Sequence, residues 1–380
     1  MKKIGRFDYI DALRGWAIIG VMITHAGLRT LDGSGFTALA RRATDLGAMG
    51  VQLFYMVSAF TILLLFEKRH IEEIRPVGSF YIRRLMRIAP VYWAGIIIYT
   101  AIYGLTGSRG WLDGPELWHY PFHFLFLNMT NPFTPSTVVP GGWSISNEVI
   151  FYIIFPALFY IVRTLKGAFI MFALFTFTSP MWAQLAQYIV EVAYPSATLK
   201  EATHFSYRWL PNQLPCFAAG FLMLHLARDD KDSLLLNRVR QHGNLAALSL
   251  ALALPLIIFL STKTSIDKNA YWGCWFLALG VVLSVHQWRI LVNKPTVWLG
   301  KISFSCYIVH FIVIDILLRL IPRTHPLADF AVITILTIPI TAAISSFSFI
   351  HFEQPFGRLS KKIVDLFQGN KNHVEITEKP

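Results

Sequence analysis

The sequence predicts an all-α protein, a polytopic membrane bundle of about ten transmembrane helices. Only 15% of its 380 residues are charged, whereas a soluble protein carries about 25%, and the mean hydropathy is +0.50. Five long apolar runs contain no Asp, Glu, Lys or Arg. Each is long enough to cross a hydrocarbon core of about 30 Å as a helix, which excludes a soluble enzyme. The runs are residues 46–66, 88–108, 167–190, 244–261 and 330–350.

The loops between the expected helices differ in charge. One set of alternate loops carries 23 of the 34 Lys and Arg residues, and the other set carries 9. Because cytoplasmic loops are enriched in these residues, we expect the first set, with both termini, to face the cytoplasm. This distribution accounts for the net charge of +12 without a nucleic-acid partner. The expected spans are residues 12–30, 46–66, 86–106, 147–163, 167–190, 211–227, 244–261, 270–288, 301–321 and 329–351.

The chain is expected to form one membrane-embedded domain over residues 1–356 and a polar cytoplasmic tail over residues 357–380. Residues 107–146 form the largest element expected outside the cytoplasm. The first part of this segment is aromatic and predicts a short re-entrant or interfacial helix, while the second part is rich in Pro, Thr and Asn and predicts a loop. Trp111 and Trp118 either contact a sugar or belong to an interfacial aromatic belt.

The first span contains the ionisable residues Asp11, Arg14 and His25. An ionisable side chain at mid-membrane costs at least about 2.5–3.5 kcal/mol, so it is usually paired or functional. Arg14 and His25 share a helix face and are about 16 Å apart along the axis, and Asp11 is close enough in sequence to pair with Arg14. The alternative is that Asp11 and Arg14 are interfacial charges and that His25 is a hydrogen-bonded core residue.

Three arginines, Arg83, Arg84 and Arg87, lie within two helical turns at the start of the third span. Like charges so placed repel each other, so an anion is expected beside them. Planar guanidinium groups suit phosphate, and the cluster therefore predicts a phosphorylated ligand that arrives from the cytoplasm. The alternative is simple anchoring at the cytoplasmic surface, which would also tolerate Lys.

Glu148 lies near the outer end of the fourth span, after a Gly-Gly pair and Trp143. An acid in the first turn of a helix can act as a cap or stabilise the helix dipole. His25 points toward the outer half of the first span, so Glu148 and His25 could instead form a carboxylate–imidazole pair. Both interpretations stay open.

The ninth span carries Ser303, Ser305, Tyr307 and His310 in an otherwise apolar helix. We expect His310 near mid-bilayer, on one helical stripe with Ser303 and Tyr307. These residues either contact a substrate or form interhelical hydrogen bonds, which are worth about 1 kcal/mol or less each.

Six segments complete the pattern: RFDYIDALRGWAIIGVMITH, GVQLFYMVSAF, FYIRRLMRIAP, GGWSISNEVIFYIIFP, LGKISFSCYIVH and FEQP. Together they resemble the acyltransferase-3 family of integral membrane acyltransferases, in the family's order, from residue 6 to residue 355. Any one segment is weak, but several in order are specific. One departure is Ser-Ala-Phe at residues 58–60, where the family more often has Ser-Gly-Phe, and it concerns helix packing rather than chemistry.

The resemblance implies a ten-span fold that transfers an acyl group, usually acetyl from acetyl-CoA, to a hydroxyl of an envelope glycan such as lipopolysaccharide O-antigen. We expect such a protein in a bacterial cytoplasmic (inner) membrane, without a metal. By position, His25 matches the essential histidine of the family, and Asp11 and Arg14 match its neighbouring polar pair. The donor-binding arginines of the family match Arg83, Arg84 and Arg87. The acid of its W-x-x-x-x-E segment matches Glu148.

The predicted reaction uses neutral His25, oriented by Glu148, as the base for direct transfer to the acceptor hydroxyl. Arg14, Tyr307 or a backbone N–H would stabilise the oxyanion. The alternative function is a proton-coupled transporter of a sugar or a lipid-linked glycan, in which the ionisable residues form a relay. The expected site comprises catalytic His25, Glu148 and Asp11, donor-binding Arg14, Arg83, Arg84 and Arg87, and substrate or oxyanion contacts at Trp143, Ser305, Tyr307 and His310.

Overall fold

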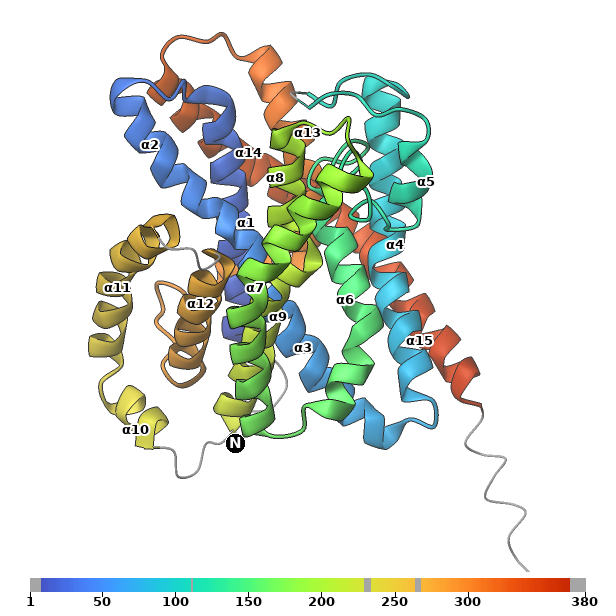
Figure 1. Ribbon diagram of the computed structural model, residues 1–380, viewed down its shortest axis with the longest axis vertical. Coiled ribbons are helices and arrows are strands. Elements are labelled where there is room, and N and C mark those ends of the chain that lie inside the picture. Colours follow the sequence, from blue (N-terminus) through green and yellow to red (C-terminus); the bar gives the residue numbers. More distant parts are fainter. Residues whose placement is uncertain (1–7, 111, 229–233, 264–267, 370–380) are drawn as a thin grey trace, which may run out of the picture.

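The computed structural model describes residues 8–110, 112–228, 234–263 and 268–369. These residues form a bundle of helices (Figure 1), and the only β interaction among them is an isolated bridge between Arg109 and Leu112. Seven segments of the described chain are long and apolar enough to cross a membrane. The prediction of an all-α polytopic membrane bundle is therefore confirmed. Trp111 lies outside the described residues.

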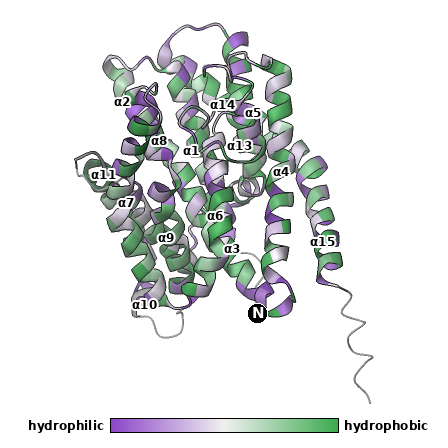
Figure 2. Cartoon of the chain, turned by 45° about the vertical axis from the view of Figure 1, so that its right-hand side comes forward, coloured by the Kyte–Doolittle hydropathy of each residue, from purple (hydrophilic) through white to green (hydrophobic). Residues whose placement is uncertain are grey.

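A long helix occurs at each of the ten predicted spans within the described chain. Figure 2 shows hydrophobic residues along the middle of these helices and hydrophilic residues mostly near their ends. The helices are α1 (Asp8–Thr30), α3 (Gly50–Glu72), α4 (Pro76–Tyr103), α6 (Gly142–Ile161), α7 (Leu165–Ala193), α9 (Leu210–Arg228), α11 (Gly243–Lys263), α12 (Lys268–Val285), α13 (Lys294–Leu320) and α14 (Pro326–Ser348).

Shorter helices occupy segments that were expected to be loops. A capping box of Ser34 and Thr37 begins α2, and one of Thr198 and Glu201 begins α8. Such amphipathic helices lack a continuous apolar run, so hydropathy alone does not reveal them. The short helix expected in the aromatic part of residues 107–146 is present as α5. The shorter helices are α2 (Gly35–Asp45), α5 (His119–Phe124), α8 (Leu199–Arg208), α10 (Leu234–Gln241) and α15 (Gln354–Gln368).

The helix that carries the arginine cluster begins ten residues earlier than the predicted span. Pro76 occupies its first turn, where the missing N–H of proline costs nothing. The three arginines therefore lie inside α4 rather than before it. A further helix, α15, packs along α4 (Figure 1). It extends into the predicted tail, of which residues 370–380 lie outside the described residues.

The closest helix contact of the bundle joins α1 and α13. A Cβ atom added at Gly15 would lie 2.1 Å from the carbonyl oxygen of Thr296, and one added at Gly300 would lie 1.8 Å from that of Asp11. Only glycine permits such an approach of two backbones. Because the two helices are in contact over most of their length, polar side chains on their facing sides meet inside the bundle.

Candidate active site

A cavity of about 580 Å³ opens among the ends of α1, α3, α4, α13 and α15. We call it the vestibule. Cationic side chains dominate its walls, and two carboxylates accompany them. The excess of positive charge makes the vestibule a site for an anionic ligand. Its charged wall residues are Arg14, Arg69, Arg83, Arg84, Arg87, Lys301, Asp11 and Glu353.

The three arginines of α4 have different partners. Arg83 Nη1 donates to Glu73 Oε2 at 3.1 Å, so its charge is already compensated. The guanidinium of Arg84 lies over the ring of Tyr152, with Cζ 5.5 Å from the ring centroid. Arg84 is buried and its Nε has no hydrogen-bond partner among the described residues. A buried guanidinium without a hydrogen-bonded counter-ion is costly, and a phosphate or carboxylate of a ligand would offset that cost.

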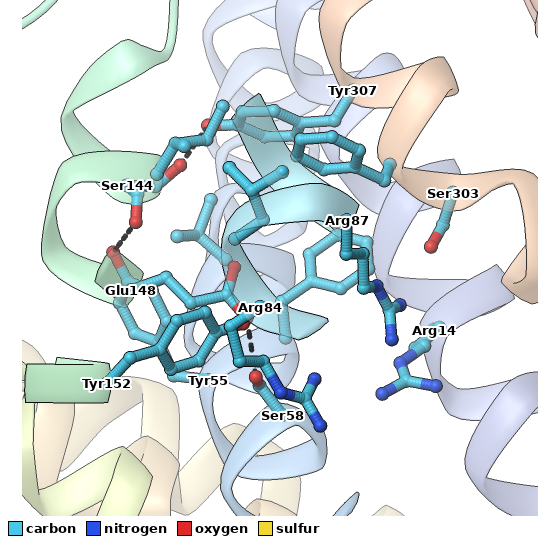
Figure 3. Close-up of a pocket in the computed structure, with 15 residues that line it drawn as sticks. Arg14, Tyr55, Ser58, Arg84, Arg87, Ser144, Glu148, Tyr152, Ser303 and Tyr307 are labelled. Carbon is cyan, nitrogen blue, oxygen red and sulfur yellow. Dashed lines mark hydrogen bonds between the residues drawn. The ribbon is translucent and has the colours of Figure 1, made fainter. Parts of the chain in front are cut away.

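A smaller cavity of about 70 Å³ adjoins the vestibule inside the bundle. We call it the inner cavity. Arg14, Arg84 and Arg87 line both cavities, so these side chains lie where the two meet. Figure 3 shows the three guanidinium groups at one end and the side chains of Tyr307 and Ser144 at the other.

Glu148 lies in the inner cavity beside the arginines. Its Oε1 accepts hydrogen bonds from Ser58 Oγ at 2.5 Å and from Tyr152 OH at 2.6 Å. The predicted pair between Glu148 and His25 is wrong, because no hydrogen bond joins them. Glu148 lies six residues into α6, about 9 Å along its axis, and this depth places the carboxylate level with the arginines. Ser58, to which the sequence analysis assigned no role, supplies one of these contacts.

The inner cavity ends at a polar layer formed by Tyr307, Ser144 and Gly141. Tyr307 OH accepts from Ser144 Oγ at 2.8 Å and donates to the carbonyl oxygen of Gly141 at 3.1 Å. Gly141 has φ +77, and a Cβ there would lie 2.8 Å from Tyr307 OH. Glycine is therefore required for both the backbone conformation and the close approach.

A histidine pair lies beyond Tyr307. His310 Nε2 and His25 Nδ1 are 3.1 Å apart, and His310 Nδ1 is 3.1 Å from the carbonyl oxygen of Cys306. The ring of Phe311 packs against both imidazoles, with centroids 4.4 Å from His25 and 4.1 Å from His310. The rings of His310 and Tyr307 are 5.7 Å apart. His25 lines neither the vestibule nor the inner cavity, and His310 connects it to the Tyr307 layer.

Sequence comparisons identify the family of the chain. The family model described as "Acyltransferase domain" matches residues 7–346. The chain belongs to this acyltransferase family. It is 23% identical over 334 residues to a Staphylococcus aureus (strain COL) protein named "Putative O-acetyltransferase", covering 83% of this chain and 52% of that protein. No solved structure matches the chain at a significant level.

Two further relatives have names that specify a glycan. "Peptidoglycan O-acetyltransferase OatA" of Listeria monocytogenes is 23% identical over 412 residues, covering 100% of this chain and 61% of that protein. "Exopolysaccharide production protein ExoZ" of Rhizobium meliloti is 27% identical over 146 residues, covering 37% of this chain and 40% of that protein. The chain thus spans about half the length of the curated relatives it matches.

Three predicted site residues of this acyltransferase-family chain lie apart from the histidine pair. Asp11 contacts Arg14 at 3.5 Å and is fourteen residues before His25 on the same helix, about 21 Å along the axis. Ser305 is fully buried; its Oγ donates to Glu353 Oε1 and lies 3.0 Å from Ser348 Oγ, whose hydroxyl can donate to it. Trp143 lies under the guanidinium of Arg208, whose Cζ is 5.7 Å from the ring centroid. Asp11 is therefore remote from a base at His25 and Ser305 is occupied by other contacts, whereas Trp143 packs against Arg208, which interacts electrostatically with His25.

The sequence analysis missed several residues that the structure brings to the two cavities. Arg69 and Lys301 contribute charge to the vestibule, and Tyr152 donates to Glu148. The i,i+4 spacing of Glu148 and Tyr152 could have indicated their pairing, whereas Arg69 was assigned to a loop because α3 extends beyond its apolar part. Within the described chain, no cluster of three His, Cys, Asp or Glu residues could hold a metal ion.

Proposed function

We propose that this protein is a membrane O-acetyltransferase that moves an acetyl group from cytoplasmic acetyl-CoA to a hydroxyl of an exported glycan. The observation that carries the proposal is the pair of adjoining cavities between the cation-lined vestibule and Tyr307, both of which Arg14, Arg84 and Arg87 line. Membership of the acyltransferase family supports the reaction class. The names of the Listeria and Rhizobium relatives support a glycan acceptor.

The vestibule suits the polyanionic end of coenzyme A. Guanidinium groups bind phosphate in a bidentate manner, and no carboxylate of the described residues hydrogen-bonds to Arg84, although Glu148 interacts with it electrostatically. Arg69, Arg87 and Lys301 add charge around it. With the phosphates held there, the thin pantetheine arm extends into the inner cavity and directs the thioester toward Tyr307.

His25 is the proposed general base. The acceptor oxygen attacks the thioester carbonyl carbon while His25 takes the hydroxyl proton, so that a C–O bond forms. The C–S bond then breaks, and the imidazolium returns the proton to the leaving thiolate of coenzyme A. The Tyr307 layer separates the inner cavity from the histidine pair, so its ring must move for the thioester to reach His25.

The proposed orientation places the vestibule and both termini in the cytoplasm of a bacterium, with the protein in its inner membrane. The bias of 23 Lys and Arg residues in one set of alternate loops against 9 in the other supports this orientation. The end of the bundle that carries α5 would then face the exported glycan. Trp143 and Arg208, which lie on that side of the inner cavity, could contact a sugar ring and its substituents.

The test is a transfer assay with purified protein in liposomes, supplied with radiolabelled acetyl-CoA and glycans extracted from the source envelope. We expect the wild-type protein to label the glycan, His25→Ala to abolish labelling, and the exposed variant His242→Ala to behave as wild type. Movement of unmodified glycan across the liposome membrane without labelling would instead support a transporter. Undiminished labelling by His25→Ala would refute the proposed base.

A further inference from the structure

We propose that His310 is a positioning residue that holds His25 in the tautomer with its proton on Nδ1, so that Nε2 of His25 is the basic nitrogen. The proposal rests on the acetyltransferase function proposed above. It replaces the predicted role of Glu148 as the group that orients His25. It also gives His310 a role distinct from the substrate contact expected from the sequence.

The hydrogen-bond chain that fixes the tautomer begins at a backbone carbonyl. The oxygen of Cys306 can only accept, so His310 Nδ1, 3.1 Å away, must carry a proton. In a neutral imidazole the other nitrogen is then an acceptor, which makes His310 Nε2 the acceptor for His25 Nδ1 at 3.1 Å. The proton of neutral His25 therefore lies on Nδ1 and its lone pair on Nε2.

A second acceptor lies near His25. The backbone carbonyl of Val21, one turn earlier in α1, also interacts with the imidazole. A carbonyl can only accept, so this contact requires a protonated ring nitrogen, and the bond to His310 assigns the proton of the neutral ring to Nδ1. His310 thus adds the contact that fixes the ring plane from the neighbouring helix.

The surroundings of His310 suit an acceptor and not a proton carrier. Its side chain is fully buried, and the rings of Tyr307 and Phe311 pack against it. Its Nδ1 is bonded within its own helix, so a proton received on Nε2 would have no onward partner. When His25 becomes an imidazolium, the bond from its Nδ1 to His310 gains the strength of a charge-assisted hydrogen bond. His310 thereby stabilises the protonated base without exchanging its own proton.

A second buried histidine of the chain shows a different pattern. His123 Nδ1 is 2.8 Å from Tyr92 OH, and its Nε2 is 2.9 Å from the carbonyl oxygen of Thr134. Both of its nitrogens are engaged by structural partners, which leaves no nitrogen for chemistry. In the pair of His25 and His310, by contrast, the chain of bonds runs from the carbonyl oxygen of Cys306 through both nitrogens of His310 to His25 Nδ1.

The first test measures steady-state acetyl transfer to the glycan that the wild-type protein labels. His310→Gln retains a side-chain oxygen that can accept from His25 Nδ1, whereas His310→Met has similar length and no comparable acceptor. We expect His310→Met to lower kcat about 10- to 100-fold with KM for acetyl-CoA changed less than about twofold. His310→Gln should recover most of the loss. Equal kcat values for the two variants, or a change confined to KM, would overturn the proposal.

A second test does not depend on activity. The ¹⁵N resonances of histidine rings in the wild-type protein in lipid bilayers distinguish protonated from unprotonated nitrogens, and a His25→Gln sample assigns the His25 signals. We expect a protonated Nδ1 and an unprotonated Nε2. The reverse tautomer would overturn the inference whether or not the protein transfers acetyl groups. The expected tautomer in a protein that transfers no acetyl group would instead count against the proposed function alone.

Discussion

Two buried arginines at different places in the bundle have opposite surroundings. Arg109 is 1% exposed, and its guanidinium donates to the carbonyl oxygens of Gly104 at 2.8 Å and Gly107 at 3.0 Å and to Tyr120 OH at 2.9 Å. Arg84 is 8% exposed and has no hydrogen bond to any described residue. The first arginine is part of a completed structure, whereas the second has donors available for a ligand.

The same contrast extends to the regions around them. In the segment 104–141, buried polar side chains bond to backbone carbonyls, as Asn128 does to Pro135 at 2.8 Å and Thr134 does to Asn128 at 2.9 Å. In the vestibule, cations exceed carboxylates. Hydrogen bonds to buried polar groups stabilise the fold, although Asn128 Oδ1 in this segment has no hydrogen-bond partner among the described residues. A cavity in which cations exceed carboxylates is poised to bind an anion.

The largest expected effect is on folding, at Arg109. Arg109→Gln removes several charge-assisted hydrogen bonds and leaves buried carbonyl oxygens without donors. We therefore expect the free energy of unfolding to fall by at least about 3 kcal/mol. Chemical denaturation followed by tryptophan fluorescence measures it. Arg163→Gln, whose guanidinium packs on the rings of Phe159 and Tyr160, is the control and should cost less than about 1 kcal/mol. Equal losses would remove the contrast between the two regions.

The second prediction concerns ligand binding at Arg84. Arg84→Gln should weaken acetyl-CoA binding roughly 10- to 100-fold, because one charge-assisted hydrogen bond to phosphate is worth about 1.5–3 kcal/mol, and it should leave the melting temperature unchanged or higher. Isothermal titration calorimetry with the non-reacting product coenzyme A measures the affinity.

The neighbouring variant Arg83→Gln serves as the matched control for Arg84. Because Glu73 already engages Arg83, we expect an affinity change of less than about threefold, in the range of a surface ion pair. If Arg83→Gln and Arg84→Gln weakened coenzyme A binding equally, the vestibule would bind coenzyme A through its total charge. The absence of a hydrogen-bonded partner at Arg84 would then not matter for binding.

The third prediction uses Glu148 as the counter-charge of the inner cavity. Glu148 interacts electrostatically with both Arg14 and Arg84. We expect Glu148→Gln to destabilise the ligand-free protein by about 1–2 kcal/mol, since buried cations lose a compensating carboxylate. Added coenzyme A should then raise the melting temperature more in this variant than in wild type. A smaller ligand-induced shift in the variant would indicate that Glu148 contacts the ligand directly.

The sequence predicted the fold and much of the cation cluster for identifiable reasons. Uncharged runs set the positions of the long helices, and the spacing of Arg83, Arg84 and Arg87 along α4 indicated an anion site. The sequence did not predict which arginine lacks a hydrogen-bonded carboxylate. The partner of Arg83 is Glu73 at the end of another helix, α3. The partner of His25 also depends on how α1 and α13 meet, which close backbone contacts at Gly15 and Gly300 determine.

The smallest expected effect concerns the segment 104–141. It tests whether the stability of the fold depends on keeping His123 in this segment neutral. Burial lowers the pKa of His123 from 6.5 to about 3. The folded protein thus keeps His123 neutral, while the unfolded chain takes up a proton below pH 6.5. The contribution of His123 to stability is complete above pH 6.5 and is lost progressively as the pH falls toward 3.

At pH 5.5 this linkage amounts to about 1 kcal/mol. His123→Gln cannot titrate, and its amide can still bond to Tyr92 and Thr134. The difference in unfolding free energy between pH 7.5 and pH 5.5 should therefore be smaller in the variant by about that amount, and other histidines cancel in the comparison. An identical pH dependence in the two proteins would mean that His123 is protonated without cost, and the segment 104–141 would then tolerate a buried charge much as the vestibule does.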